Sequence, residues 1–177
     1  RSYLSWLDGV FARYPDLIIE NCSSGGMRID YAMLSRYSIQ STSDQENYLD
    51  YATIAANSPS GLTPEQSAVW TYPMNHEEQV PEDALKEEVV FNMVNAMLLR
   101  VHQSGHLAKL DDARKELVKE GLDLYKKIRS DIKDFYPFWP LGLSSYADEW
   151  VSLGMRGEKK CYLAVWRREG TQESRVL

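Results

Sequence analysis

Along the first sixty residues, the spacing of apolar positions alternates between helical segments and short strand-like segments. In residues 2–14 the apolar side chains recur every three or four positions, which predicts an amphipathic helix. Short segments over 17–19 and 38–42 predict buried strands. A short helix over 31–36 and a longer one over 46–57 complete the pattern. Because strands and helices alternate, the chain is predicted to pair its strands in parallel, in an α/β fold.

The rest of the chain predicts a third strand, two long helices and a final strand pair. Residues 68–72 have the composition of a buried strand. Residues 84–103 are largely apolar and predict a helix buried on more than one side. Residues 111–135 predict an amphipathic helix with mixed charges on its outer face. Residues 149–153 and 159–167 then predict an antiparallel hairpin.

Composition indicates a globular protein and narrows its partners. With 44% hydrophobic residues in 177 positions, the chain can bury a sizeable core. Its net charge of −6 repels a phosphate backbone, so nucleic acid is not an expected partner. A membrane is not expected either, because no apolar run reaches the ~20 residues of a spanning helix. The two cysteines, Cys22 and Cys161, make no disulfide framework, which predicts a cytoplasmic location.

The most specific chemistry in the sequence lies between residues 20 and 44. Small residues over 22–26 follow the first predicted strand, and they let a backbone approach a ligand closely. The second predicted strand is followed directly by Ser43 and Asp44. Polar and small residues at the carboxyl ends of consecutive strands are typical of a β/α barrel active site. The pattern therefore predicts a binding loop beside a catalytic carboxyl group.

This stretch resembles glycoside hydrolase family 36, the retaining α-galactosidases and their relatives. The family pattern is Glu-x-Cys-x-Ser-Gly-Gly-x-Arg-x-Asp, followed by Gly-Met-Leu and then by Trp-Thr-Ser-Asp. The residues of this chain that match it are Glu20, Cys22, Ser24, Gly25, Gly26, Arg28, Asp30, Met33, Leu34, Thr42, Ser43 and Asp44. Such a gapped match is far more specific than a lone glycine motif.

The resemblance implies both an architecture and site residues. The expected fold class is α/β: a partial (β/α)8 (TIM) barrel, about its last three β/α units, followed by a short antiparallel β segment. The barrel part and its C-terminal helices would occupy residues 1–135, and the start of the C-terminal β-sandwich would occupy 136–177. In this family Asp44 corresponds to the acid/base carboxyl group, while Cys22 and Gly25 line the galactose pocket. Arg28 and Asp30 would form a buried structural pair.

The chain also departs from the family pattern. Ser41 stands where the family usually has Trp, and Ala32 where it has Gly. No Lys-Trp-Asp-type motif, which carries the family's nucleophile, occurs in the sequence. Retaining hydrolysis needs two carboxyl groups about 5–5.5 Å apart. The second carboxylate would have to come from Glu20, Asp30, Glu46 or a partner chain.

Each candidate residue also has a purely structural interpretation. Asp44 precedes a predicted helix and can be its N-cap, where the helix dipole would favour the ionised form. Cys22 can be a small buried residue at a strand end. Trp70 and Tyr72 can stack on a sugar face, although core packing is the favoured interpretation. We include Ser24 and Trp70 among the candidate substrate contacts.

The histidines do not predict a metal site. His102 and His106 have the i, i+4 spacing of a helical metal pair, but Ser104-Gly105 indicates that the helix ends between them. A third ligand is not evident, and His76-Glu77-Glu78 is typical of a solvated loop. We therefore expect no metal and no cofactor.

Two functions from different classes follow from these residues. The first is a glycoside hydrolase acting on a galactose-containing saccharide, with Asp44 as general acid/base. The second is a non-catalytic barrel fragment with residual sugar binding or an assembly role. A partial parallel sheet leaves open edges and apolar faces, so we expect a homodimer or higher homo-oligomer that completes the site. The enzyme is favoured because Cys22, Gly25 and Asp44 are retained together.

Overall fold

The chain forms helices packed with two β-sheets, and the computed structural model describes residues 2–73 and 82–177. The predicted loop at His76-Glu77-Glu78 lies outside these residues. The helices are α1 (Ser2–Arg13), α2 (Tyr31–Leu34), α3 (Tyr48–Asn57), α4 (Glu82–Met97) and α5 (Asp112–Ile132), with 3-10 turns η1 (Ser58–Ser60) and η2 (Leu107–Lys109). The strands are β1 (Glu20–Asn21), β2 (Ile39–Ser41), β3 (Ser67–Thr71), β4 (Arg100–Gln103), β5 (Tyr136–Phe138), β6 (Trp150–Arg156) and β7 (Cys161–Arg167).

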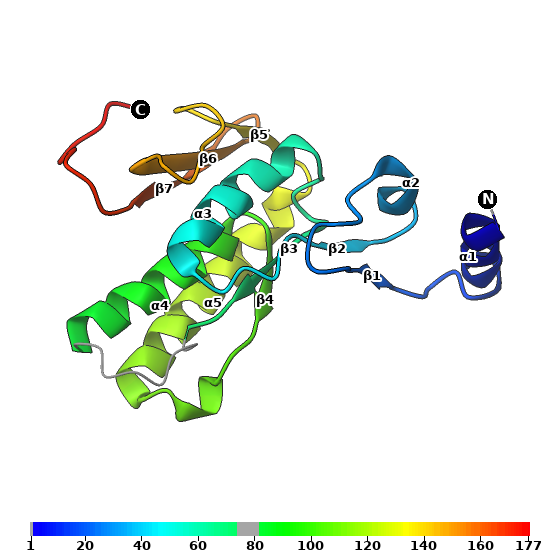
Figure 1. The fold of residues 1–177 in the computed structure, drawn as a ribbon, viewed down its shortest axis with the longest axis horizontal. Helices are drawn as coiled ribbons and strands as arrows, with labels where there is room; N and C mark the ends of the chain where they lie inside the picture. The colour runs from blue at the N-terminus through cyan, green and yellow to red at the C-terminus, as the bar shows by residue number, and fades with distance from the viewer. Residues whose placement is uncertain (1, 74–81) are drawn as a thin grey trace.

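The long helices form the body of the molecule, and the two sheets lie against them. Figure 1 shows the antiparallel sheet above α3, while the parallel sheet lies beside α3 and α4. The segment that carries α1, α2 and β1 projects from this body. In the part of the chain that the structure describes, no helix is both long and apolar enough to cross a membrane.

Four parallel strands make the first sheet. They lie in the order β1-β2-β3-β4, so each strand pairs with its neighbour along the chain. Consecutive parallel strands with intervening helices are the repeating unit of a β/α barrel. The predicted parallel α/β arrangement is therefore confirmed.

One strand occupies a segment that the sequence pattern assigns to a helix. The apolar run over 84–103 predicts a single helix, but α4 ends at Met97 and β4 begins at Arg100. β4 pairs with β3 over four residue pairs, from Ala68–Arg100 to Thr71–Gln103. Periodicity alone cannot separate a buried helix from a buried strand in a continuous apolar run. Pairing with β3 decides the structure here, and it adds one strand to the three that were predicted.

The first strand also lies later than predicted. The apolar run at 17–19 precedes β1, and Leu17 and Ile18 are 41% and 67% exposed. β1 is the edge strand of its sheet. In the described structure, these two side chains are therefore exposed, although they were expected to be buried. The local pattern of a strand followed by a polar loop is as predicted.

The second sheet is antiparallel, in the order β5-β6-β7. The predicted turn at 154–157 lies instead at 157–160, where the Gly157 N–H donates to the Lys160 carbonyl at 3.0 Å. Gly154 is inside β6 opposite Phe138, and a Cβ there would collide with the Phe138 ring. The boundary predicted between 1–135 and 136–177 falls between α5 and β5, and it stays a prediction.

Helix α3 is buried between the two sheets. Three of its residues are alanines with no exposed surface, which allows close approach from both sides. The fully buried partners from the sheets are Val69, Val151, Leu153 and Met155. Arg168, just beyond β7, adds a hydrogen bond from its Nη1 to the Thr53 hydroxyl of α3 at 3.2 Å. Residues on either side of α3 therefore share one core.

The Tyr51 hydroxyl of α3 joins two strand ends of the parallel sheet. It lies 2.9 Å from the Thr42 hydroxyl and donates to the Ser43 carbonyl at 3.2 Å. It also accepts from the Trp70 backbone N–H at 3.2 Å. Tyr51 is 1% exposed, so water cannot replace these partners. This single phenol therefore fixes the segment that leads to Asp44 against β3.

Replacing Tyr51 with Phe tests this role. The Tyr51→Phe substitution keeps the ring but leaves buried backbone groups without a partner, so the free energy of unfolding should fall by about 1–3 kcal/mol. Urea denaturation measures this change. Tyr14, which is 57% exposed, provides the matched control, and Tyr14→Phe should alter stability by less than about 0.5 kcal/mol. Equal effects of the two substitutions would contradict the role of Tyr51.

Candidate active site

The loop after β1 and the segment after β2 meet at the carboxyl edge of the parallel sheet. Ser24 and Gly25 both have positive φ, 44° and 69°, which makes the loop turn sharply. Gly25 is buried against the backbone of Ser43 and Asp44. A Cβ on Gly25 would lie 2.6 Å from the Asp44 nitrogen, so only glycine fits. The structure thus brings together two residues that the sequence predicts for the site.

Asp44 is exposed and does not cap a helix. The N-cap of α3 is Asn47, whose Oδ1 accepts from the Leu49 N–H at 2.9 Å. The N-cap interpretation of Asp44 is therefore wrong. Among residues 2–73 and 82–177, no hydrogen bond or ion pair engages the Asp44 carboxylate. Its side chain is available for a ligand.

Two phenols lie within electrostatic reach of Asp44. Burial raises the pKa of Tyr51 to about 12, and the Asp44 carboxylate adds to this shift. Burial also raises the pKa of Tyr72, and the negative charges of Glu46 and Asp44 raise it further. Both phenols are therefore protonated at neutral pH. The sequence predicts a stacking or a packing role for Tyr72, and the structure places it near both carboxylates.

The sheet face beside this edge carries a chain of polar and aromatic contacts. The Trp70 indole donates to the Ser41 hydroxyl at 3.0 Å, so Trp70 contacts the residue that replaces the family's usual Trp. The His102 ring meets the Trp70 ring edge-on, with 4.9 Å between centroids. Trp70 is half-buried, which leaves both the packing and the stacking interpretation open.

Glu20 and His102 come from the two outer strands of the sheet yet lie close together. The His102 Nδ1 is 4.0 Å from the Glu20 Oε1. Burial lowers the pKa of His102, although the Glu20 carboxylate opposes this shift. The Glu20 Oε1 is buried and has no hydrogen-bond partner in the described structure. The sequence did not predict this contact because it placed His102 on a helix.

The structure alters several other sequence interpretations. Cys22 is exposed, so it is not a small buried residue, and Ser24 is exposed on the same loop. Arg28 and Asp30 are exposed rather than a buried pair, and Asp30 caps α2 by accepting from the Met33 N–H at 3.1 Å. His102 lies on a strand, so the helical metal spacing does not apply. The described residues contain no group of three His, Cys, Asp or Glu side chains placed to hold a metal.

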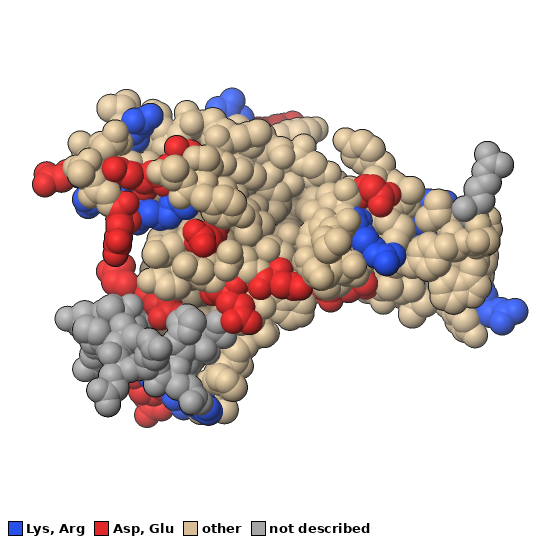
Figure 2. Space-filling model, viewed as in Figure 1, with Lys and Arg blue, Asp and Glu red and all other residues tan. Residues whose placement is uncertain are grey.

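Acidic side chains mark the face on which this edge lies. Figure 2 shows them across the middle of the view, over the segment that leads into α3. Such a face would repel anionic ligands and suits neutral ones.

Solved structures show the same fold. The galactosidase domain of the alpha-galactosidase–sucrose kinase AgaSK matches with a TM-score of 0.76 at 22% identity, covering 98% of this chain and 24% of that one. A variant of the GH36 alpha-galactosidase AgaA from Geobacillus stearothermophilus, in complex with raffinose, matches with a TM-score of 0.77 at 19% identity, covering 96% and 23%. The alpha-galactosidase from Lactobacillus brevis matches with a TM-score of 0.75 at 16% identity, covering 96% and 22%.

These structures confirm the partial barrel, and this chain spans about a quarter of their length. A search of curated proteins finds no match. A scan against protein families matches residues 3–134 to Melibiase. This match covers most of the sequence, including the loop after β1 and Asp44, and it agrees with the resemblance to glycoside hydrolase family 36. The chain therefore belongs to the Melibiase family.

Proposed function

We propose that this chain supplies the acid/base side of an active site that hydrolyses galactosides, with Asp44 as general acid/base. The observation that carries the proposal is the packing of Gly25 on the Asp44 backbone, which sets an uncommitted carboxylate beside the glycine-rich loop. Membership of the Melibiase family and the alpha-galactosidase fold support the substrate class.

Asp44 would perform two proton transfers. As an acid it protonates the oxygen of the leaving group, and as a base it then activates the water that releases the sugar. The tight Gly25 contact limits movement of the Asp44 backbone, which favours a fixed position during both steps. The Tyr51 hydroxyl adds a second restraint through the Ser43 carbonyl.

The loop after β1 would bind the sugar ring. Cys22 and Ser24 are exposed on this loop, and Gly25 holds the loop against the Asp44 backbone. Trp70 would present part of its indole as a stacking surface, with the ring held by its hydrogen bond to Ser41.

The second carboxylate has fewer candidates than the sequence alone suggested. Asp30 is engaged in capping α2. Glu46 and Asp44 both lie close enough to Tyr72 for their charges to raise its pKa. Glu20 lies on the sheet face near His102. We infer that the nucleophile is Glu46, Glu20 or a carboxylate brought by a partner chain.

A homo-oligomer would bring such a carboxylate and cover the open sheet edge. Large apolar side chains are uncovered on the projecting segment that contains α1, β1 and α2, and they include Trp6, Ile18, Met27 and Tyr31, which are 63%, 67%, 77% and 83% exposed. Clusters of this kind mark association surfaces. A two-fold dimer is the simplest assembly that pairs these segments.

The proposal extends to the location of the protein. Both cysteines are free and exposed, as expected of a protein in a reducing compartment. We infer that the enzyme is cytoplasmic, because the cytoplasm is such a reducing compartment.

Replacing Asp44 tests the mechanism. Asp44→Asn should lower the rate of nitrophenyl α-galactoside hydrolysis by about 10²–10⁴-fold, because the amide transfers no proton. A parallel assay with nitrophenyl β-galactoside identifies which anomer the chain hydrolyses. Asp134→Asn, at an exposed aspartate beyond α5, is the control and should retain the full rate. Equal rates for the two variants would remove Asp44 from the mechanism. Absence of activity in the unmodified chain would favour the non-catalytic fragment.

Sedimentation equilibrium tests the assembly. The chain should be a dimer or larger at micromolar concentration, and Ile18→Glu should shift it to monomer, because a charge cannot be buried cheaply in an apolar interface. Leu124→Glu is the matched control, since Leu124 is also exposed, at 49%, but lies on α5. A monomeric unmodified chain, or dissociation by both substitutions alike, would contradict an interface at this segment.

A further inference from the structure

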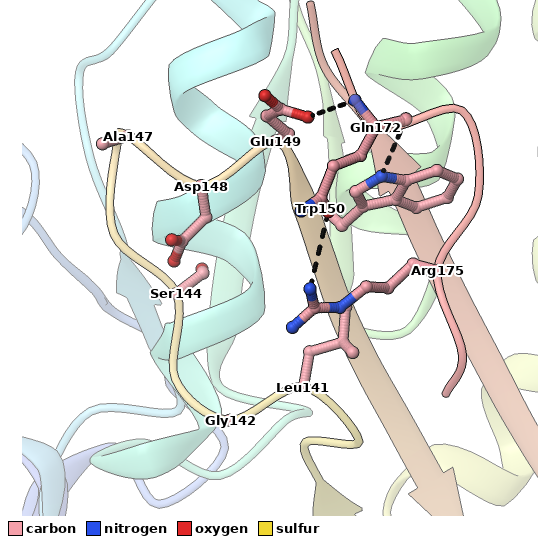
Figure 3. Close-up of a pocket in the computed structure, with 9 residues that line it drawn as sticks. All are labelled: Leu141, Gly142, Ser144, Ala147, Asp148, Glu149, Trp150, Gln172 and Arg175. Atoms are coloured by element: carbon pink, nitrogen blue, oxygen red, sulfur yellow. Dashed lines mark hydrogen bonds between the residues drawn. The ribbon is translucent and has the colours of Figure 1, made fainter. Parts of the chain in front are cut away.

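A pocket lies on the antiparallel sheet, and none of its lining residues belongs to the loops around Asp44. Figure 3 shows it between the loop that precedes β6 and the tail that follows β7. Its volume is about 270 Å³, which suits a small ligand. The polar side of its lining consists of Ser144, Asp148, Glu149, Trp150, Gln172 and Arg175.

Glu149 and Trp150 hold the tail that forms one wall. The Glu149 carboxylate accepts from the backbone N–H groups of Thr171 at 3.1 Å and Gln172 at 2.9 Å. These hydrogen bonds lower the pKa of Glu149, so the group stays ionised. The Trp150 indole donates to the Gln172 carbonyl at 3.3 Å. Gly170 completes the arrangement, because a Cβ there would collide with the Glu149 side chain.

Asp148 and Arg175 have unused hydrogen-bonding capacity. One Asp148 oxygen accepts from the Ser145 N–H at 2.7 Å, which leaves the other available. Arg175 makes one long contact, 3.5 Å, to the Gln172 side chain. Within the described ranges, neither group has an ion-pair partner within 4.0 Å. Figure 3 shows their side chains extending from opposite walls of the pocket.

Trp150 adds an aromatic wall. The Arg167 guanidinium lies over its ring, 5.8 Å from the centroid, and the indole N–H is bound to the tail. The ring is therefore held in one orientation while it lines the pocket. A fixed indole offers a flat apolar surface to a ligand without loss of side-chain freedom on binding.

The charges of the lining indicate the class of ligand. Two carboxylates and one guanidinium give the pocket a negative balance, which disfavours phosphate and other anions. A sugar hydroxyl both donates and accepts hydrogen bonds. Neighbouring hydroxyls of one sugar ring can therefore donate to the free Asp148 oxygen and accept from the Arg175 guanidinium. We propose that this pocket is an accessory binding site for a neutral saccharide, separate from the site around Asp44.

Amide and indole NMR signals of the ¹⁵N-labelled chain, titrated with raffinose, test the proposal. The Trp150 indole N–H and the backbone signals of Gln172 and Arg175 should shift together along one binding curve. Asp148→Asn and Arg175→Gln should each weaken this binding about 10-fold, the effect of losing a hydrogen bond to a charged group. Asp134→Asn, at an exposed aspartate beyond α5, is the control and should leave the affinity unchanged.

The outcome is independent of catalysis by Asp44. Asp44→Asn should leave the binding curve of the Trp150 indole intact even where it abolishes hydrolysis. The proposal is overturned if the Trp150 signal does not move, or if shifts are confined to residues 22–47. Equal weakening by Asp134→Asn would overturn it as well. Arg175 lies on an exposed tail, so Arg175→Gln remains a usable variant if Asp148→Asn disturbs folding.

Discussion

The burial of α3 between two sheets is the constraint on which the rest of the structure depends. The helix can be covered on both sides only because Ala52, Ala55 and Ala56 present almost no side-chain bulk. The same helix carries Tyr51, whose hydroxyl reaches the ends of β2 and β3. A displacement of α3 would therefore disturb the shared core and the segment that holds Asp44 together. The position of the candidate carboxylate is thus a consequence of how the helix packs.

Close backbone contact, rather than side-chain hydrogen bonding, organises the loops at the sheet edge. Gly25 packs directly on the Ser43–Asp44 peptide, and this is possible only without a side chain. Other groups hold the neighbours of Asp44, since Tyr51 binds the Ser43 carbonyl and Asn47 caps the helix, and no group in the described part of the chain engages the Asp44 carboxylate. A functional group can be well positioned and still chemically unused in this way. A proton-transfer group needs both properties, a fixed backbone and a carboxylate that no other group occupies.

Local patterns in the sequence predicted the elements that local chemistry determines. The glycine-rich loop, the strand before Ser43 and the amphipathic α5 all follow from residue type and spacing. β4 could not be predicted, because Arg100 to Gln103 are held in a strand by pairing with β3, and that pairing is not local. For the same reason the contact between Glu20 and His102 was missed. The alternative interpretation of Asp44 as the N-cap was wrong, since Asn47 has the same capping ability and only the start of α3 distinguishes them.

The Glu20 oxygen that lacks a hydrogen-bond partner links the candidate site to the open face of the sheet. Buried carboxylate oxygens in folded proteins have hydrogen-bond donors, because leaving one without a donor is costly. The His102 Nδ1 lies 4.0 Å from this oxygen, too far for a hydrogen bond. A donor from outside the described residues, whether water, a ligand or a partner, would complete the surroundings of this oxygen. In the mechanism proposed above, the second carboxylate is one of this chain's own glutamates or a group brought by a partner. Under that proposal, a partner that covers this face would supply both a donor for Glu20 and a carboxylate for the site, and assembly would complete the chemistry.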